Sequence, residues 1–180
     1  MGQGVLERIA VPPDQRGRVG GGQVALGSVV IGGAVLLAER LARAYSPAPT
    51  NPGVRRYWKR LRKPNMQPPD WAFGIWGPLY AMLAISGLRV WNARPGWERT
   101  QALLLWGGMQ ALDVLWLWLG FGRRERGAMA LESGTAIANA AAYVAAARRV
   151  DRIAADLAVP HLAWLAFAAL LSEELWRKNR

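Results

Sequence analysis

The sequence predicts an all-α integral membrane protein, a bundle of five transmembrane helices, and three observations lead to this class. The chain has 180 residues, of which 52% are hydrophobic and 19% are charged. The charges gather between five long apolar runs, at about 24–44, 71–91, 102–121, 128–147 and 153–176. Runs of this length can cross roughly 30 Å of hydrocarbon. The predicted membrane domain is therefore 24–180.

The first 23 residues are polar, rich in glycine and proline, and without a periodic hydrophobic pattern. Such a composition is typical of a disordered tail, so 1–23 is predicted to be a disordered N-terminal tail. The chain has no cysteine, which excludes disulfides, iron–sulfur clusters and thiolate metal sites. A net charge of +11 would indicate nucleic acid in a soluble protein. Here the basic residues lie in loops beside apolar runs, so we expect anionic lipid headgroups as partners and no nucleic acid.

The longest predicted loop, 46–70, joins the first two apolar runs and is basic and proline-rich. Its middle, 54–63, has the pattern of a short amphipathic helix, with Tyr57 at the membrane interface. Three prolines follow, and each removes a backbone donor and disfavours helix just before it. The chain is therefore expected to bend or run extended until the second membrane helix begins near Trp71.

The third apolar run carries Asp113 in its middle. An ionisable group at mid-membrane costs a few kcal/mol, so Asp113 should face the bundle interior with a partner or be protonated. We expect it to contact a polar ligand group or an ordered water. The alternative is a hydrogen bond between helices.

Two other ionisable residues in the apolar runs are given structural interpretations. Glu132 lies near the start of the fourth run, where the helix dipole favours an acidic group, and is interpreted as interfacial. His161 is the one histidine and has no cysteine or histidine partner, so it is interpreted as an interface residue rather than a metal or haem ligand. The fourth run also carries a stripe of small residues suited to close helix packing and to a homodimer, namely Gly134, Ala138, Ala142 and Ala146.

Aromatic residues recur at three- and four-residue steps in the apolar runs, which places them on shared helix faces. Trp76 and Tyr80 share one such face, and Trp164 and Phe167 share another. Flat aromatic walls suit a flat conjugated ligand, because ring stacking gains dispersion without many hydrogen bonds. The alternative is that these rings fill the core. Tryptophans near the ends of the runs are interpreted as an interfacial belt, namely Trp58, Trp91, Trp97 and Trp176.

The distribution of lysine and arginine predicts the orientation. With five spans, nine basic residues fall on the side of the N-terminus and 14 on the side of the C-terminus. The positive-inside rule places the richer side in the cytoplasm, which gives an outer N-terminus and a cytoplasmic C-terminus. The expected location is a bacterial inner membrane, or an organelle membrane if the source is eukaryotic.

Three segments carry a recognisable pattern in a fixed order: YWKRLRKPNMQPPDWAFGIWGPLY from Tyr57, ALDVLWLWLGFG from Ala111, and PHLAW from Pro160. Together they resemble the TspO/MBR family of tryptophan-rich sensory proteins and translocator proteins. This sequence departs from the family pattern at Met66, where the family has tryptophan, and at Asp113, where it has asparagine. Near the C-terminus, Ser172 and Glu173 replace an asparagine–aromatic pair.

The resemblance implies a five-helix bundle, often dimeric, that binds tetrapyrroles, and in some members sterols, in a pocket closed by the first loop. The expected ligand is protoporphyrin or haem, with no required cofactor, no catalytic residue and no metal site. Carried over position by position, the implied ligand-binding residues are Tyr57, Pro68, Pro69, Trp71, Phe73, Trp76, Tyr80, Ala111, Asp113, Trp116, Trp164 and Phe167.

The predicted function is to bind a hydrophobic tetrapyrrole and to act in its sensing, transport or regulation. Two alternatives stay open. One is an enzyme that degrades bound porphyrin photo-oxidatively with the help of the tryptophan cluster. The other is a structural membrane protein whose pocket holds lipid or sterol. The sequence shows no nucleophile–base pair and no phosphate-cradling glycine loop, which favours binding over catalysis.

Overall fold

The computed structural model describes residues 4–47, 50–69 and 74–180, and these residues form seven α-helices and no strand. The α-helices are α1 (Val5–Ala10), α2 (Gly21–Tyr45), α3 (Pro52–Arg60), α4 (Trp76–Trp91), α5 (Trp97–Leu117), α6 (Arg126–Val150) and α7 (Arg152–Lys178). A 3₁₀ turn, η1 (Pro13–Gln15), follows α1, and a π-helical segment, η3 (Trp118–Arg123), extends α5. The all-α prediction is confirmed.

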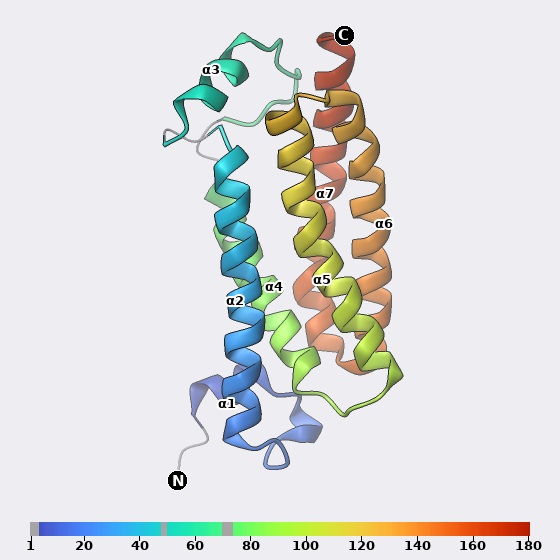
Figure 1. Cartoon of the computed structure of the whole chain (residues 1–180). Helices are drawn as coiled ribbons and strands as arrows, with labels where there is room; N and C mark the ends of the chain where they lie inside the picture. The colour runs from blue at the N-terminus through green and yellow to red at the C-terminus, as the bar shows by residue number, and fades with distance from the viewer. Residues whose placement is uncertain (1–3, 48–49, 70–73) are drawn as a thin grey trace.

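The five longest helices run side by side, and α3 lies across one end of them (Figure 1). The N-terminus lies at the opposite end from α3 and the C-terminus. We call the end with α3 the cavity end and the other the N-terminal end. This arrangement places residues from all five long helices around a common interior.

Three helices in the described residues are long and apolar enough to cross a membrane: α2, α5 with η3, and α7. The sequence predicts five. Helix α4 has 16 residues, which at 1.5 Å per residue is about 24 Å, shorter than the hydrocarbon core. It begins at Trp76, five residues later than predicted. Helix α6 has 25 residues but is rich in alanine, with arginine in its last turn. Both nevertheless pack against the apolar helices, α4 on α7 and α6 between α5 and α7.

Small side chains allow α6 and α7 to approach each other closely. Ala140 and Ala147 of α6 and Ala154 and Ala158 of α7 are all almost completely buried in the core. The predicted small-residue stripe lies on a different face, because most of its members, Gly134, Ala138 and Ala142, are exposed. Packing inside the bundle therefore uses a second set of alanines; three members of the stripe point outward and the fourth, Ala146, is buried in the core.

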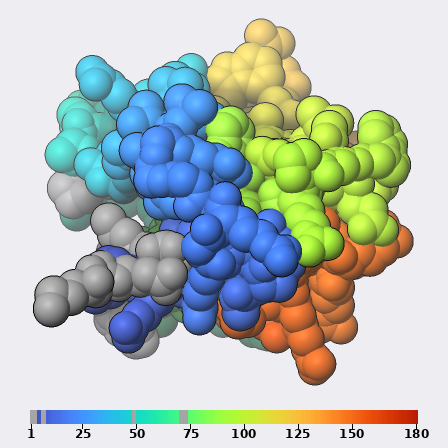
Figure 2. All heavy atoms as spheres, turned by 90° about the horizontal axis from the view of Figure 1, so that it is seen from below, coloured from blue at the N-terminus to red at the C-terminus, as the bar shows by residue number. Residues whose placement is uncertain are grey.

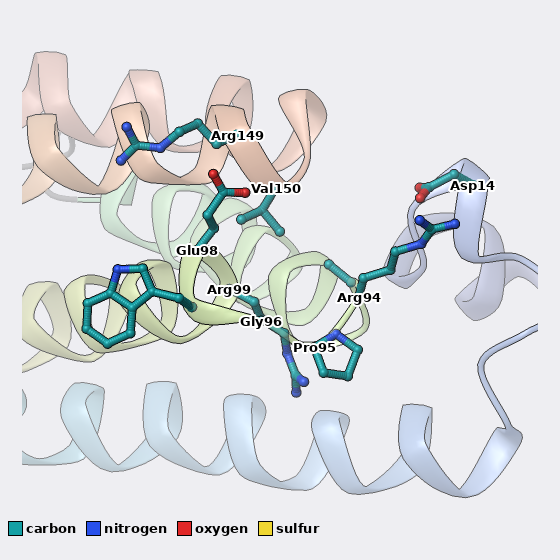
Figure 3. Close-up of a pocket in the computed structure, with 10 residues that line it drawn as sticks. Asp14, Arg94, Pro95, Gly96, Glu98, Arg99, Arg149 and Val150 are labelled. Atoms are coloured by element: carbon teal, nitrogen blue, oxygen red, sulfur yellow. The ribbon is translucent and has the colours of Figure 1, made fainter.

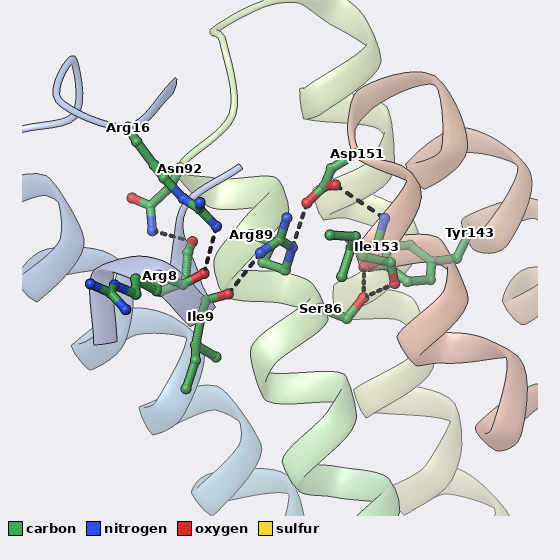
Figure 4. Close-up of polar contacts among 11 residues, drawn as sticks. Arg8, Ile9, Arg16, Ser86, Arg89, Asn92, Tyr143, Asp151 and Ile153 are labelled. Atoms are coloured by element: carbon green, nitrogen blue, oxygen red, sulfur yellow. Dashed lines mark hydrogen bonds and ion pairs between the residues drawn. The ribbon is translucent and has the colours of Figure 1, made fainter. Parts of the chain in front are cut away.

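The segment before α2, predicted to be a disordered tail, contains α1 and η1 in the described residues and contacts α4. Two side chains in or just after the last turn of α4 donate hydrogen bonds to the backbone of this N-terminal segment. Arg89 Nη1 donates to the carbonyl of Ile9 at 2.9 Å, and Asn92 Nδ2 donates to the carbonyl of Ala10 at 3.1 Å (Figure 4). In Figure 2 this segment, in blue, lies beside the α4–α5 connection (green) and the α6–α7 connection (orange). Buried donors on α4 thus tie the segment to the bundle.

Polar groups join α4 to α6 and α7 at the same end (Figure 4). Arg89 Nε lies 2.6 Å from Asp151 Oδ2, and both side chains are more than nine-tenths buried. The Ser86 hydroxyl lies 2.6 Å from the Tyr143 hydroxyl and donates to the carbonyl of Ala154 at 2.7 Å. At the N-terminal end, therefore, each of these buried polar side chains has at least one protein partner, although Arg89 Nη2 and Asn92 Oδ1 have none among the described residues.

Candidate functional site

A cavity of about 700 Å³ occupies the bundle interior at the cavity end. Its walls come from α2, α4, α5, α6 and α7, and residues of α3 and the following proline-rich loop cover it. Small-molecule sites in proteins have volumes of roughly 300–1,000 Å³. The cavity is large enough for a ligand of that class.

One wall of the cavity is a group of aromatic rings from α4 and α7. Trp76 stacks on Tyr80 with ring centroids 5.6 Å apart, and meets Trp164 edge-on at 6.0 Å. Phe167 packs behind Trp164 at 5.6 Å. The one-turn spacing between Trp76 and Tyr80 places both rings on the same face of α4.

A second part of the cavity wall contains Trp116 of α5, whose orientation is set by hydrogen bonds. Its Nε1 lies 3.1 Å from both Ser133 Oγ of α6 and Ser172 Oγ of α7. Its ring also meets Phe121 edge-on at 6.1 Å. Trp116 is therefore held by three elements, and a ligand would meet a surface that is already in place.

Six of the twelve predicted ligand-binding residues line the cavity: Pro68, Trp76, Tyr80, Asp113, Trp116 and Trp164. Four others lie elsewhere: Tyr57, Pro69, Ala111 and Phe167. Trp71 and Phe73 lie outside the described residues. Ala111 lies two positions before Asp113 in α5, which separates the two side chains by about 200° around the helix axis. Because Asp113 faces inward, Ala111 faces outward and is exposed. Tyr57 accepts a hydrogen bond from Arg126 Nη1 at 2.8 Å instead.

Three interpretations of single residues are wrong. Trp58, assigned to the interfacial belt, lines the cavity. Glu132, assigned to the interface, is 7% exposed and also lines the cavity. His161 is 1% exposed inside the bundle, with Nε2 3.6 Å from Asp113 Oδ1. Helix α6 carries alanine on most sides, so no hydrophobic face in the sequence marks the inward position of Glu132.

Several buried polar atoms around the cavity lack a hydrogen-bond partner among the described residues. They include Asp113 Oδ2, both carboxyl oxygens of Glu132 and the indole nitrogen of Trp164. Buried polar groups in proteins are nearly always paired, so unpaired atoms that face a cavity indicate where a ligand or water can bind. Within the described ranges, no group of three or more histidine, cysteine, aspartate or glutamate residues could hold a metal ion.

Basic side chains line the part of the cavity next to α3, which we call the mouth: Arg43, Arg55, Lys59 and Lys63. Helix α3, which supplies two of them, begins after Asn51, whose side chain accepts from the backbone N–H of Val54 at 3.4 Å. Lys63 packs over the Trp58 ring, with Nζ 3.3 Å from the ring centroid. The mouth is therefore cationic, whereas the interior is apolar with two carboxyl groups.

The loop that covers the cavity is attached to the end of α7. The Asn179 side chain accepts from the backbone N–H of Arg62 at 2.8 Å and donates to its carbonyl at 2.9 Å. Lys178 Nζ donates to Asn65 Oδ1 at 2.5 Å, and Glu174 accepts from the Asn65 N–H at 3.1 Å. We call Asn179, Lys178 and Glu174 the latch, since they bind the covering loop through its backbone and through Asn65.

A smaller hollow of about 340 Å³ lies at the N-terminal end, around the α4–α5 connection (Figure 3). Its lining mixes charges of both signs, and Figure 3 shows Arg94 directed toward Asp14. Trp97, on its edge, is 73% exposed, as expected for an interfacial tryptophan. The hollow has neither aromatic walls nor a field of one sign, so the larger cavity is the better candidate site.

Comparison with known proteins gives a consistent match. The profile of the TspO/MBR family matches residues 34–177, a range that includes every residue lining the large cavity. The translocator protein of Ovis aries is 37% identical over 132 residues, covering 69% of this chain and 76% of the relative. That of Homo sapiens is 35% identical over 131 residues, covering 69% and 75%. The tryptophan-rich protein TspO of Chlorobaculum tepidum is 27% identical over 127 residues, covering 68% and 79%.

Proposed function

Because the chain belongs to the TspO/MBR family and is an integral membrane protein, we propose that it binds a hydrophobic tetrapyrrole in the cavity beneath α3. Family membership supports a role in membrane sensing or transport. The observation that carries the proposal is the cavity itself: about 700 Å³, with Trp76, Trp116 and Trp164 in its walls and basic residues at its mouth.

The chemistry of the cavity fits a tetrapyrrole in two ways. A flat conjugated ring gains dispersion from the indole faces, and the fixed orientation of Trp116 reduces the entropy lost on binding. The propionate groups of such a ligand would lie at the mouth, where Arg55 and Lys59 supply positive charge. Iron is not needed for either contact, so protoporphyrin and haem are both candidates.

The five-span topology belongs to the same proposal. Helices α4 and α6 lie alongside the three apolar spans and contribute to the same core and cavity, which supports five crossings. The termini lie at opposite ends of the bundle, as an odd number of crossings requires. The excess of basic residues on the C-terminal side supports a cytoplasmic C-terminus, in a bacterial inner membrane or an organelle membrane.

Fluorescence titration tests the binding proposal. The purified full-length chain in lipid nanodiscs is titrated with protoporphyrin, and saturable quenching of tryptophan emission is expected. Trp116→Phe should weaken binding about three- to tenfold, since it removes an oriented ring contact. The matched control Trp97→Phe, at the exposed far end, should leave affinity unchanged. Absence of saturable quenching, or equal weakening in both variants, would contradict the proposal.

Illumination of the same samples distinguishes binding from degradation. If the ligand is only bound, its absorption spectrum changes no faster during exposure than that of protoporphyrin in nanodiscs without the protein. A new absorbing product that forms with the intact chain and not with Trp116→Phe would support the enzymatic alternative. Lipid or sterol that copurifies and is not displaced by protoporphyrin would support the structural alternative.

A further inference from the structure

Two carboxyl groups from neighbouring helices line the cavity. Asp113 of α5 is 5% exposed and Glu132 of α6 is 7% exposed, and both line the cavity. Asp113 Oδ2 and both oxygens of Glu132 have no hydrogen-bond partner among the described residues. A buried acceptor without a donor is costly, and two neighbouring carboxylates also repel each other. We call this pair the acceptor floor.

Other polar side chains near the acceptor floor cannot satisfy it. The hydroxyls of Ser133 and Ser172 donate to the carbonyls of Met129 at 3.0 Å and Ala168 at 2.7 Å. Their oxygens accept from Trp116. Their protons are therefore not free for a carboxylate.

Two further neighbours reach only Asp113. His161 Nε2 lies 3.6 Å from Asp113 Oδ1, beyond the usual N–H···O distance. The Tyr80 hydroxyl interacts with the Asp113 carboxyl but leaves Oδ2 without a partner. No described side chain therefore supplies a donor to the three unpaired oxygens of the floor, and a ligand or water that enters the cavity can supply it.

The mouth and the acceptor floor have opposite polarity. Basic side chains of α3 and its loop line the mouth, and the carboxyls lie on the inner walls between α5 and α6. A ligand with carboxylates at one edge and N–H donors in its body matches both regions. The reverse orientation would place its carboxylates against Asp113 and Glu132, where like charges repel.

From this polarity we infer that Asp113 and Glu132 accept hydrogen bonds from the ring N–H groups of a metal-free tetrapyrrole, so that the chain prefers it to a metal complex of the same ring. The inference rests on the proposed function and narrows its ligand class. In a planar neutral porphyrin the N–H groups point to the ring centre. When the ring takes up a proton on an imine nitrogen, from solvent or from a carboxyl group of the floor, it puckers, and its N–H groups then project from the face, where the carboxylates can accept them. A metal complex has no ring N–H, so it leaves the buried acceptors unpaired.

Matched ligands test this preference. Protoporphyrin and its palladium(II) complex share ring and propionates, and palladium(II) stays four-coordinate, so no axial bond to His161 can replace the lost hydrogen bonds. Affinities for the full-length chain in nanodiscs are measured by tryptophan quenching. We expect the free base to bind about tenfold more tightly than the complex.

Substitutions at Asp113 and Glu132 test whether the acceptor floor causes the preference for the metal-free ligand. In Asp113→Asn/Glu132→Gln the affinity ratio should fall to within about twofold of one. The double variant Asp156→Asn/Glu173→Gln is the matched control, because both carboxyls are about half exposed and neither lines the cavity. It should leave the ratio near ten. Each single floor variant should give an intermediate ratio, which provides a readout if the double variant does not fold.

The outcomes separate this inference from the proposed function. Equal affinity for both ligands in the unmodified chain, or an unchanged ratio in the floor variants, overturns the inference and leaves tetrapyrrole binding intact. If neither ligand binds, the proposed function fails and the inference fails with it.

Discussion

The two ends of the bundle differ in how their buried acidic side chains are paired. At the N-terminal end, Arg89 pairs with Asp151 at 2.6 Å, and Ser86 bonds both to Tyr143 and to a backbone carbonyl. At the cavity end, Glu132 is as deeply buried as Asp151, at 7% against 9% exposure, yet neither of its oxygens has a partner among the described residues. Asp151 and Glu132 are thus buried to a similar extent, but only Asp151 has a partner for its carboxyl group.

This difference separates structural from ligand-binding polar groups within one fold. A buried ion pair adds little net stability, but removing one of its two partners strongly destabilises the folded chain. An unpaired group destabilises it, and persists where something outside the chain can supply the missing donor. The comparison predicts that equivalent substitutions at the two ends will have different consequences.

The largest effect is expected at the N-terminal end, from Asp151→Asn. Asparagine can still cap α7, as Asp151 does through the N–H of Ile153, so the change chiefly removes the charge that Arg89 faces. An unpaired buried arginine should lower the free energy of unfolding by about 3 kcal/mol. The measurement is loss of helical circular dichroism during titration with denaturing detergent.

The control for this substitution is Asp156→Asn. Asp156 faces Arg148 at 3.6 Å, and both side chains are more than half exposed. Its loss should change the free energy of unfolding by less than about 0.5 kcal/mol. Equal effects of the two substitutions would show that burial of the Arg89–Asp151 pair has no energetic role.

The next effect concerns packing between α4 and α5. A Cβ at Gly87 would lie 2.6 Å from the indole of Trp106, which is itself fixed by a 2.9 Å hydrogen bond to the carbonyl of Leu83. Gly87→Ala should therefore destabilise by about 1–3 kcal/mol. Gly107, also helical, has open space around its Cβ, so Gly107→Ala should be neutral or slightly stabilising. Similar melting temperatures for both variants would contradict the close contact.

Much of this architecture could be predicted from the sequence, for identifiable reasons. Apolar runs and the motifs around Tyr57, Ala111 and Pro160 depend on local patterns, and they identified the helical class and the family. Trp116 and Trp164 lie inside apolar runs, and it was mainly the resemblance to the TspO/MBR family that assigned them to the pocket; both line the cavity. The limits of the runs were less certain, since α4 begins only at Trp76 after a proline-rich loop.

The remaining features depend on contacts between distant residues. From the sequence, Arg89 is expected to be the exposed charged end of a membrane span. It is buried in the structure because Asp151, 62 residues later, faces it. Glu132 is interpreted from the sequence as interfacial, because α6 carries alanine on most sides and no strongly hydrophobic face marks the side of the helix that points inward. The N-terminal segment is held by donors from α4, a helix some 80 residues away in sequence. Single-sequence patterns contain none of this pairing.

A third prediction sharpens the comparison at the cover of the cavity. Asn179→Ala removes both hydrogen bonds to the Arg62 backbone from the latch. Because these bonds are exposed, the cost should be about 1 kcal/mol, which corresponds to roughly fivefold faster ligand release. Stopped-flow displacement of bound protoporphyrin measures this rate. Arg180→Ala, which removes only a contact with the Trp176 ring, is the control and should leave the rate unchanged.

The smallest expected effect on stability, and the sharpest contrast, comes from Glu132→Gln. It makes the same chemical change as Asp151→Asn at nearly equal burial. Since the carboxyl of Glu132 has no partner in the described chain, its neutralisation breaks no ion pair and removes the cost of burying a charge. The free energy of unfolding of the ligand-free chain should therefore be unchanged or higher by up to about 1 kcal/mol. A loss of 2 kcal/mol or more in the same detergent titration would mean that Glu132 has a structural partner, and that the two ends do not differ in the way described.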